Sequence, residues 1–232
     1  MTTLHSNRFC KQIQFVIAII FWLSAQSLSA QTISFISVWN KEEAKPYKRF
    51  YSEKIQDSVQ LETLRFYVSK VCFLKNEQHV WEEKNSFHLM DWDEEMSFKV
   101  DVAKDFDALS FCIGIDSVTN VSGAMGGDLD PTIGMYWTWQ SGYINFKIEG
   151  TSPVCKTRNH AFQWHVGGYQ FLNAAIQEIK LACRNKKEIV IAVDLKKMFE
   201  QASVVTHPEV MSPSKEAVQL SSVFKTCFSI KE

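Results

Sequence analysis

A glycine-rich segment that leads directly into an alternating stretch constrains the fold of this chain more than any other feature. Turn-forming residues that oppose a helix fill its first half: Gly123, Gly126, Gly127 and the step Asp130-Pro131. Apolar residues then recur at every second position, at Met135, Trp137 and Trp139. That period is typical of a β-strand with one face turned toward a core. The stretch predicts a loop followed by a strand.

The apolar residues change sides after Ser141-Gly142 and continue at Ile144, Phe146 and Ile148. A bulge or bend at a Ser-Gly pair can re-aim two halves of a strand without ending it. We therefore expect one continuous, bent strand from Met135 to Ile148.

The rest of the chain contains about nine short strand-like runs and little helical periodicity. Only Leu195–Gln201 and Ser214–Lys225 have a helical pattern. Aromatic residues make up 13% of the chain, and they favour strands. The prediction is an all-β fold: a single-domain antiparallel β-sandwich over residues 31–232, with long loops and little helix. An α/β arrangement of the C-terminal third is the alternative.

The first thirty residues have the pattern of a signal peptide. Arg8 and Lys11 precede the apolar run Phe15–Leu23, and small residues end the segment at Ser27–Ala30. The apolar run is shorter than the roughly 20 residues that a spanning helix needs, although a retained anchor is the alternative. We expect a periplasmic or secreted protein without stable membrane insertion. The formal net charge of −1 gives no reason to expect a nucleic-acid partner.

Five cysteines follow the signal segment, and no two have the spacing of a CxxC motif: Cys72, Cys112, Cys155, Cys183 and Cys227. An exported chain permits disulfides, but an odd number leaves at least one thiol free. Cys72, Cys112 and Cys183 lie inside apolar runs, which favours buried small side chains over bridges there.

Sequence motifs for catalysis are weak in this chain. Asp128 and Asp130 could act as paired acids in a small secreted hydrolase, but both lie in a turn, where aspartate is common for backbone reasons. We expect no catalytic residues and no enzyme activity. Histidine offers better support for metal binding, because His165 precedes Val-Gly-Gly near a strand end. A strand histidine satisfied by ordinary hydrogen bonds is the alternative.

Several segments together resemble the MbnP-like family of exported copper-binding proteins. They are Phe87-His-Leu-Met-Asp91, Asn120-Val-Ser-Gly-Ala124, the central segment from Gly134 to Gly150, and Phe162-Gln-Trp-His-Val-Gly-Gly-Tyr169. The resemblance implies a mononuclear copper site made of two histidines and a tryptophan oxidised to kynurenine. It also implies a diheme, peroxidase-like partner enzyme that carries out this oxidation.

Carried over to this chain, the resemblance assigns His88 and His165 as the metal ligands. The candidates for the oxidised tryptophan are Trp137, Trp139 and Trp92, and the site loop contains Asp128 and Asp130. We expect these groups to converge at one end of the sandwich, in a protein that acquires or handles copper. Imidazole suits zinc equally well, so zinc with a bound water is an alternative ion. A secreted carbohydrate- or protein-binding module that uses Trp137 and Trp139 is the alternative function.

Overall fold

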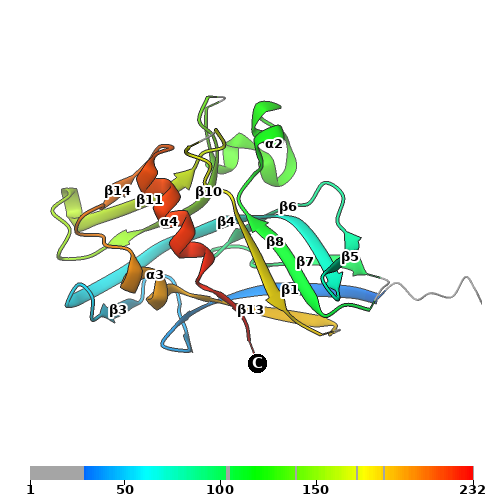
Figure 1. Ribbon diagram of the computed structural model, residues 1–232. Coiled ribbons are helices and arrows are strands. Elements are labelled where there is room, and N and C mark those ends of the chain that lie inside the picture. Colours follow the sequence, from blue (N-terminus) through cyan, green and yellow to red (C-terminus); the bar gives the residue numbers. More distant parts are fainter. Residues whose placement is uncertain (1–28, 103–104, 139, 171, 185, 232) are drawn as a thin grey trace, which may run out of the picture.

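The computed structural model describes residues 29–231, except 103–104, 139, 171 and 185. Strands are the main regular structure of this part of the chain and form two sheets that pack face to face (Figure 1). The first strand, β1 (Ser29–Trp39), pairs with β7 from Ser29 onward. Residues 1–28 lie outside the described residues, so the signal peptide of residues 1–30 stays a prediction.

The smaller sheet is built around β1. Its neighbours are β13 (Glu188–Asp194), which runs parallel to it, and the antiparallel strands β7 (Ser97–Val102) and β2 (Glu42–Glu43). The last strand, β15 (Phe228–Ile230), pairs with β13.

The larger sheet is built around the 19-residue strand β4 (Asp57–Lys75). Its strand order is β12 (Gln177–Ala182), β8 (Ala108–Ile113), β4, β10 (Gly142–Thr151), β11 (Ala161–Gly167) and β14 (Glu209–Val210). Three more strands pair with β4: β3 (Arg49–Ser52), β5 (Gln78–Glu82) and β6 (Phe87–Asp91). A short strand, β9 (Tyr136–Thr138), pairs with β10. Because β4 is so long, different strands pair with different parts of it.

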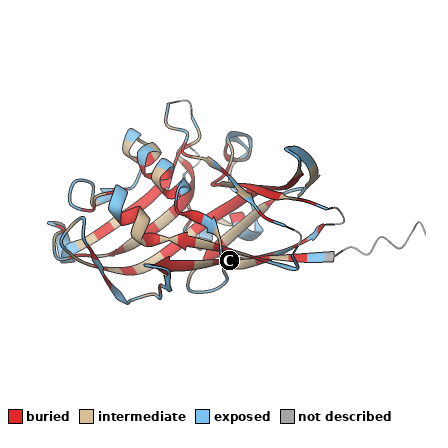
Figure 2. Ribbon diagram, turned by 60° about the horizontal axis from the view of Figure 1, so that its bottom comes forward, coloured by how far each residue is buried: buried red, intermediate tan, exposed pale blue. Residues whose placement is uncertain are grey.

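Alternation along the strands divides the apolar residues between two clusters. The main core lies between the two sheets, whose strands carry many buried residues (Figure 2). It contains Phe35 of β1 and Phe66 of β4. A second cluster lies on the outer face of the larger sheet, around Tyr67, Met135 and Tyr143. Tyr67 follows Phe66 directly in β4, so the two clusters occupy opposite faces of this sheet.

Helices are few and short in the described part of the chain. They are α2 (Ser117–Val121), α3 (Leu195–Gln201), α4 (Lys215–Lys225) and the 3-10 turns η1 (Gly127–Leu129), η2 (Pro131–Ile133) and η3 (Arg158–His160). The side chains of Asp194 and Ser214 cap the first turns of α3 and α4. No helix in residues 29–231, gaps aside, is long and apolar enough to cross a membrane.

The all-β prediction is confirmed, with two corrections. The sheets are mixed, because β1 pairs with β13 and β11 pairs with β14 in parallel. The alternating stretch is also a hairpin and not one bent strand, since Gly142 pairs with Thr138 in an antiparallel register. Gly142 makes the reversal possible: its φ is +75°, and a Cβ there would lie 2.0 Å from the side-chain oxygen of Asn120.

Candidate functional site

His88 is held from two sides at the edge where the two sheets meet. It lies opposite Val68 of β4, and therefore faces the main core. Its Nε2 atom is 2.7 Å from the Glu83 carboxylate, which also accepts a 2.7 Å hydrogen bond from Ser86. The imidazole stacks on Phe98 of β7, with ring centroids 3.8 Å apart. These contacts fix both the position and the plane of the ring.

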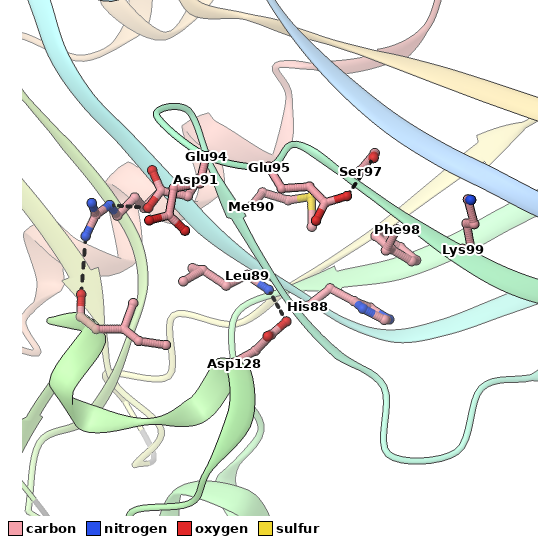
Figure 3. A pocket seen from close by; sticks show the side chains of 12 residues that line it. His88, Leu89, Met90, Asp91, Glu94, Glu95, Ser97, Phe98, Lys99 and Asp128 are labelled. Carbon is pink, nitrogen blue, oxygen red and sulfur yellow. Dashed lines mark hydrogen bonds and ion pairs between the residues drawn. The ribbon is translucent and has the colours of Figure 1, made fainter.

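A cavity of about 750 Å³ opens beside His88 (Figure 3). Four carboxylates line it: Asp91, Glu94, Glu95 and Asp128. The cationic side chains in its lining are Arg65 and Lys99, and Arg65 forms an ion pair of 2.9 Å with Asp91. The lining is acidic in balance and contains one oriented imidazole, which suits a cationic ligand.

Asp128 helps to build one wall of this cavity. Its carboxylate accepts a 2.9 Å hydrogen bond from the backbone N–H of Leu89 in β6 (Figure 3). Asp130 has a different task, because its carboxylate accepts hydrogen bonds from the backbone and hydroxyl of Thr132 and caps η2. These bonds lower the pKa of Asp130. The two carboxylates thus bond to different segments, and they are not arranged as a pair of catalytic acids.

His165 lies on the other side of the larger sheet. Its neighbours in β11, Trp164 and Val166, belong to the main core, so its own side chain points to the outer face. The Nε2 atom of His165 is 2.6 Å from Glu149 of β10. This hydrogen bond is the largest cause that lowers the pKa of Glu149 to about 2.

The structure does not bring His88 and His165 together. His88 lies on β6 and His165 on β11, and β4 and β10 lie between these two strands in the sheet. The backbones of β6 and β11 are therefore three strand spacings apart, roughly 14 Å. The two imidazoles also point to opposite faces. The structure thus places the two expected ligands apart, and the described residues contain no group of three or more His, Cys, Asp or Glu side chains arranged to hold a metal ion.

The glycine-rich loop and the described hairpin tryptophan lie on the same face as His165. Tyr67 donates a 2.8 Å hydrogen bond to the Asp128 carbonyl, and Lys147 donates one of 2.7 Å to Gly134. Trp137 packs against the second cluster. A Cβ on Gly167, two residues after His165, would lie 2.9 Å from the Trp137 ring. The loop and Trp137 thus cover the face that His165 shares.

The other tryptophan candidates lie apart from this face or outside the described residues. Trp92 follows β6, is partly buried against the main core, and donates a 3.0 Å backbone hydrogen bond to Leu64. Trp139 lies outside the described residues.

Comparison with known proteins gives the family. A sequence profile of the MbnP family matches residues 28–212. The chain belongs to the MbnP family. Among solved structures it is similar to MbnP from Methylosinus trichosporium, with a TM-score of 0.62 and 15% sequence identity, over 82% of this chain and 86% of that chain. A search of curated proteins gave no match. The structural likeness shows that this member of the MbnP family shares the MbnP fold.

Sequence reasoning missed the two glutamates that hold the histidines in this MbnP-family chain. Glu83 lies before β6, five residues from His88, and nothing in its local pattern marks it. Glu149 could have been found, because the alternation of Phe146 and Ile148 puts it on the polar face of β10, and the same alternation puts His165 on the polar face of β11. Sequence reasoning also missed Phe98, because that side chain reaches His88 from the other sheet.

Proposed function

We propose that this protein binds copper outside the cytoplasm and holds the ion at His88, in the carboxylate-lined cavity. Membership of the MbnP family and the resemblance of its motifs to exported copper-binding proteins support copper as the ion. The role is binding, for copper acquisition or handling, and not turnover.

The observation that carries this proposal is the hydrogen bond between His88 and Glu83. Metal-binding histidines almost always donate their second ring N–H to a carboxylate or carbonyl, which fixes the ring and its tautomer. With Nε2 on Glu83, the nitrogen left for an ion is Nδ1. Imidazole suits copper, and the acidic lining of the cavity would attract a cation to it.

The proposal departs from the ligand set implied by the resemblance. His165 points to the opposite face of the sheet, and Trp137 packs on that same opposite face, so neither joins His88. Copper, when bound, would supply an electrophilic, redox-active centre beside the imidazole. Glu83 would orient the ring and Phe98 would hold its plane.

Copper binding by the purified protein and two variants tests this proposal. We expect His88→Gln to abolish the thermal stabilisation by Cu²⁺, about 2.7 kcal/mol at a hundredfold excess over the dissociation constant, and His165→Gln to retain it. Equal losses in both variants would show that the two histidines act together after a rearrangement. An unchanged copper affinity in His88→Gln would contradict copper binding at His88.

Tryptophan oxidation needs a separate measurement. Mass spectrometry of the protein purified from its own host, compared with protein made without the diheme partner, would show whether Trp92, Trp137 or Trp139 is converted to kynurenine. Unmodified tryptophans together with copper binding would support a site that depends on His88 alone.

A further inference from the structure

A thiol and an imidazole meet on the outer face of the larger sheet, away from His88. The Sγ atom of Cys72 in β4 lies 3.9 Å from Nε2 of His79 in β5. Val71 and Phe73, on either side of Cys72, belong to the main core, whereas Cys72 clusters with Leu74 and Ala108 on the outer face. The register between β4 and β5 brings the two side chains together, since His79 pairs with Leu74 next to a bulge.

The distance fits one metal ion between the two atoms. Metal–sulfur and metal–nitrogen bonds of ~2.3 and ~2.0–2.1 Å separate the donors by about 3.6 Å at a tetrahedral angle and about 4.4 Å in a line. The observed separation lies between these limits and is long for a hydrogen bond. We propose that Cys72 and His79 form a second metal site, which takes a cuprous ion with Sγ and Nε2 as its ligands.

The donor set favours a soft monovalent ion over a divalent one. A thiolate selects Cu(I) among the copper oxidation states, and Cu(I) tolerates a set of only two donors. Zinc in a structural site almost always takes four ligands. When the ion binds, the S–H bond of Cys72 breaks and its proton goes to solvent, while neutral His79 donates the lone pair on Nε2.

A reactive-cysteine role for the same pair fits less well. Burial raises the pKa of Cys72, and the nearby carboxylates of Glu82 and Glu178 raise it further, against the opposing effect of Lys180. A nucleophilic cysteine needs the reverse, a lowered pKa that keeps the thiolate available. Cys72 thus stays protonated until an ion displaces the proton.

The thiol and the imidazole differ in their exposure to solvent. Cys72 is buried, with 4% of its surface exposed, while His79 is exposed and lies at the start of the short strand β5. Ser110 of β8 lies directly opposite Cys72, and Cys112 lies two residues further along the same face of β8. An ion would therefore reach the thiol by way of the imidazole.

Competition for Cu(I) with a coloured chelator, without oxygen, tests the site in the full chain. We expect Cys72→Ser and His79→Gln each to weaken the binding of one equivalent of Cu(I) at least tenfold. Matched controls are Cys155→Ser, whose buried thiol donates to the Val204 carbonyl, and His160→Gln, an exposed histidine whose Nδ1 is 2.9 Å from the Cys155 backbone carbonyl. Both controls should bind Cu(I) like the unchanged protein.

X-ray absorption at the copper edge should show one sulfur and one nitrogen ligand. A Cu(I) spectrum without sulfur, or unchanged Cu(I) affinity in His79→Gln, would overturn the proposal. His79 is exposed, so this variant is expected to fold even if Cys72→Ser does not. Preferential binding of Zn²⁺ would also contradict it. Cu²⁺ binding at His88 should be unaffected by these variants, so the two copper proposals fail or succeed separately.

Discussion

The imidazole of His88 lies flat against the ring of Phe98, with the two ring planes 5° from parallel. His88 belongs to the larger sheet and Phe98 to the smaller one, so this stack joins the two sheets at the edge of the cavity. A ring that is held in this way presents its nitrogens in fixed directions. The candidate site thus depends on how the two sheets pack.

Shortening Phe98 tests this dependence. We expect Phe98→Leu to lower the free energy of unfolding by about 1–2 kcal/mol and also to weaken metal binding at His88, because the ring loses one of its two supports. Phe111→Leu is the control, since Phe111 is also buried but contacts the rings of Phe35 and Phe228. Urea denaturation and copper titration give the two quantities. Equal copper affinities in both variants would mean that stacking does not position His88.

Removing the charge of Glu83 should weaken metal binding without removing a ligand. We expect Glu83→Gln to reduce copper affinity roughly 10–100-fold. A neutral amide accepts the hydrogen bond from His88 Nε2 more weakly than the charged carboxylate does, so it fixes the His88 tautomer less well. Glu149→Gln changes the same kind of pair on the other face of the sheet, and it should leave copper affinity unchanged. Isothermal titration of both variants gives the comparison. A larger loss in Glu149→Gln would assign the site to His165.

Glu149 should make the protein sensitive to acid. Its pKa is lowered from 4.5 to about 2 in the folded state, chiefly by the hydrogen bond with His165. A lowered pKa stabilises the fold above the unfolded value, so this contribution is lost as the pH falls from about 4.5 to about 2. Glu149→Gln should reduce the change in unfolding free energy across that range by on the order of 2 kcal/mol, a value lowered by solvent screening because Glu149 is only half-buried. Parallel curves for the two proteins in urea unfolding would contradict this.

Gly167 should not tolerate a side chain. A Cβ there would lie 2.4 Å from the backbone oxygen of Tyr143 and would also press on Trp137. We expect Gly167→Ala to cost about 1–3 kcal/mol, because β10 and β11 must separate. Gly126→Ala is the control: nothing lies within 4 Å of its Cβ position, and a change within about 0.5 kcal/mol is expected. Thermal unfolding of both variants would show whether the close approach of the strands matters.

Local patterns predicted the elements of this fold well where one face of a strand is clearly polar. Lys147 and Glu149 alternate with Phe146 and Ile148, and the structure places the two pairs on opposite faces of β10. The helix at Leu195–Gln201 was predicted with the bounds that α3 has. The long stretch after the glycine-rich loop was misjudged, because a bend and a reversal at Ser141-Gly142 produce the same change of apolar phase.

The candidate site was less predictable, and the two histidines show why. His165 stands between Trp164 and Val166, so its outward direction could be inferred from alternation alone. His88 stands between Phe87 and Leu89, which belong to the second cluster, while Met90 on its own face belongs to the main core. Both faces of β6 are apolar, and the sequence therefore gave no direction for His88.

The sequence by itself determined the all-β class, the division of most strands into two faces, and the motifs that mark the MbnP family, because each depends on residues close together in the chain. Tertiary structure alone decided that His88 meets Glu83 and Phe98, that His165 meets Glu149 on the opposite face, and that Cys72 meets His79. These contacts depend on which strands become neighbours and in what register. A shift of one residue in a strand moves every side chain to the other face, so local patterns cannot fix them.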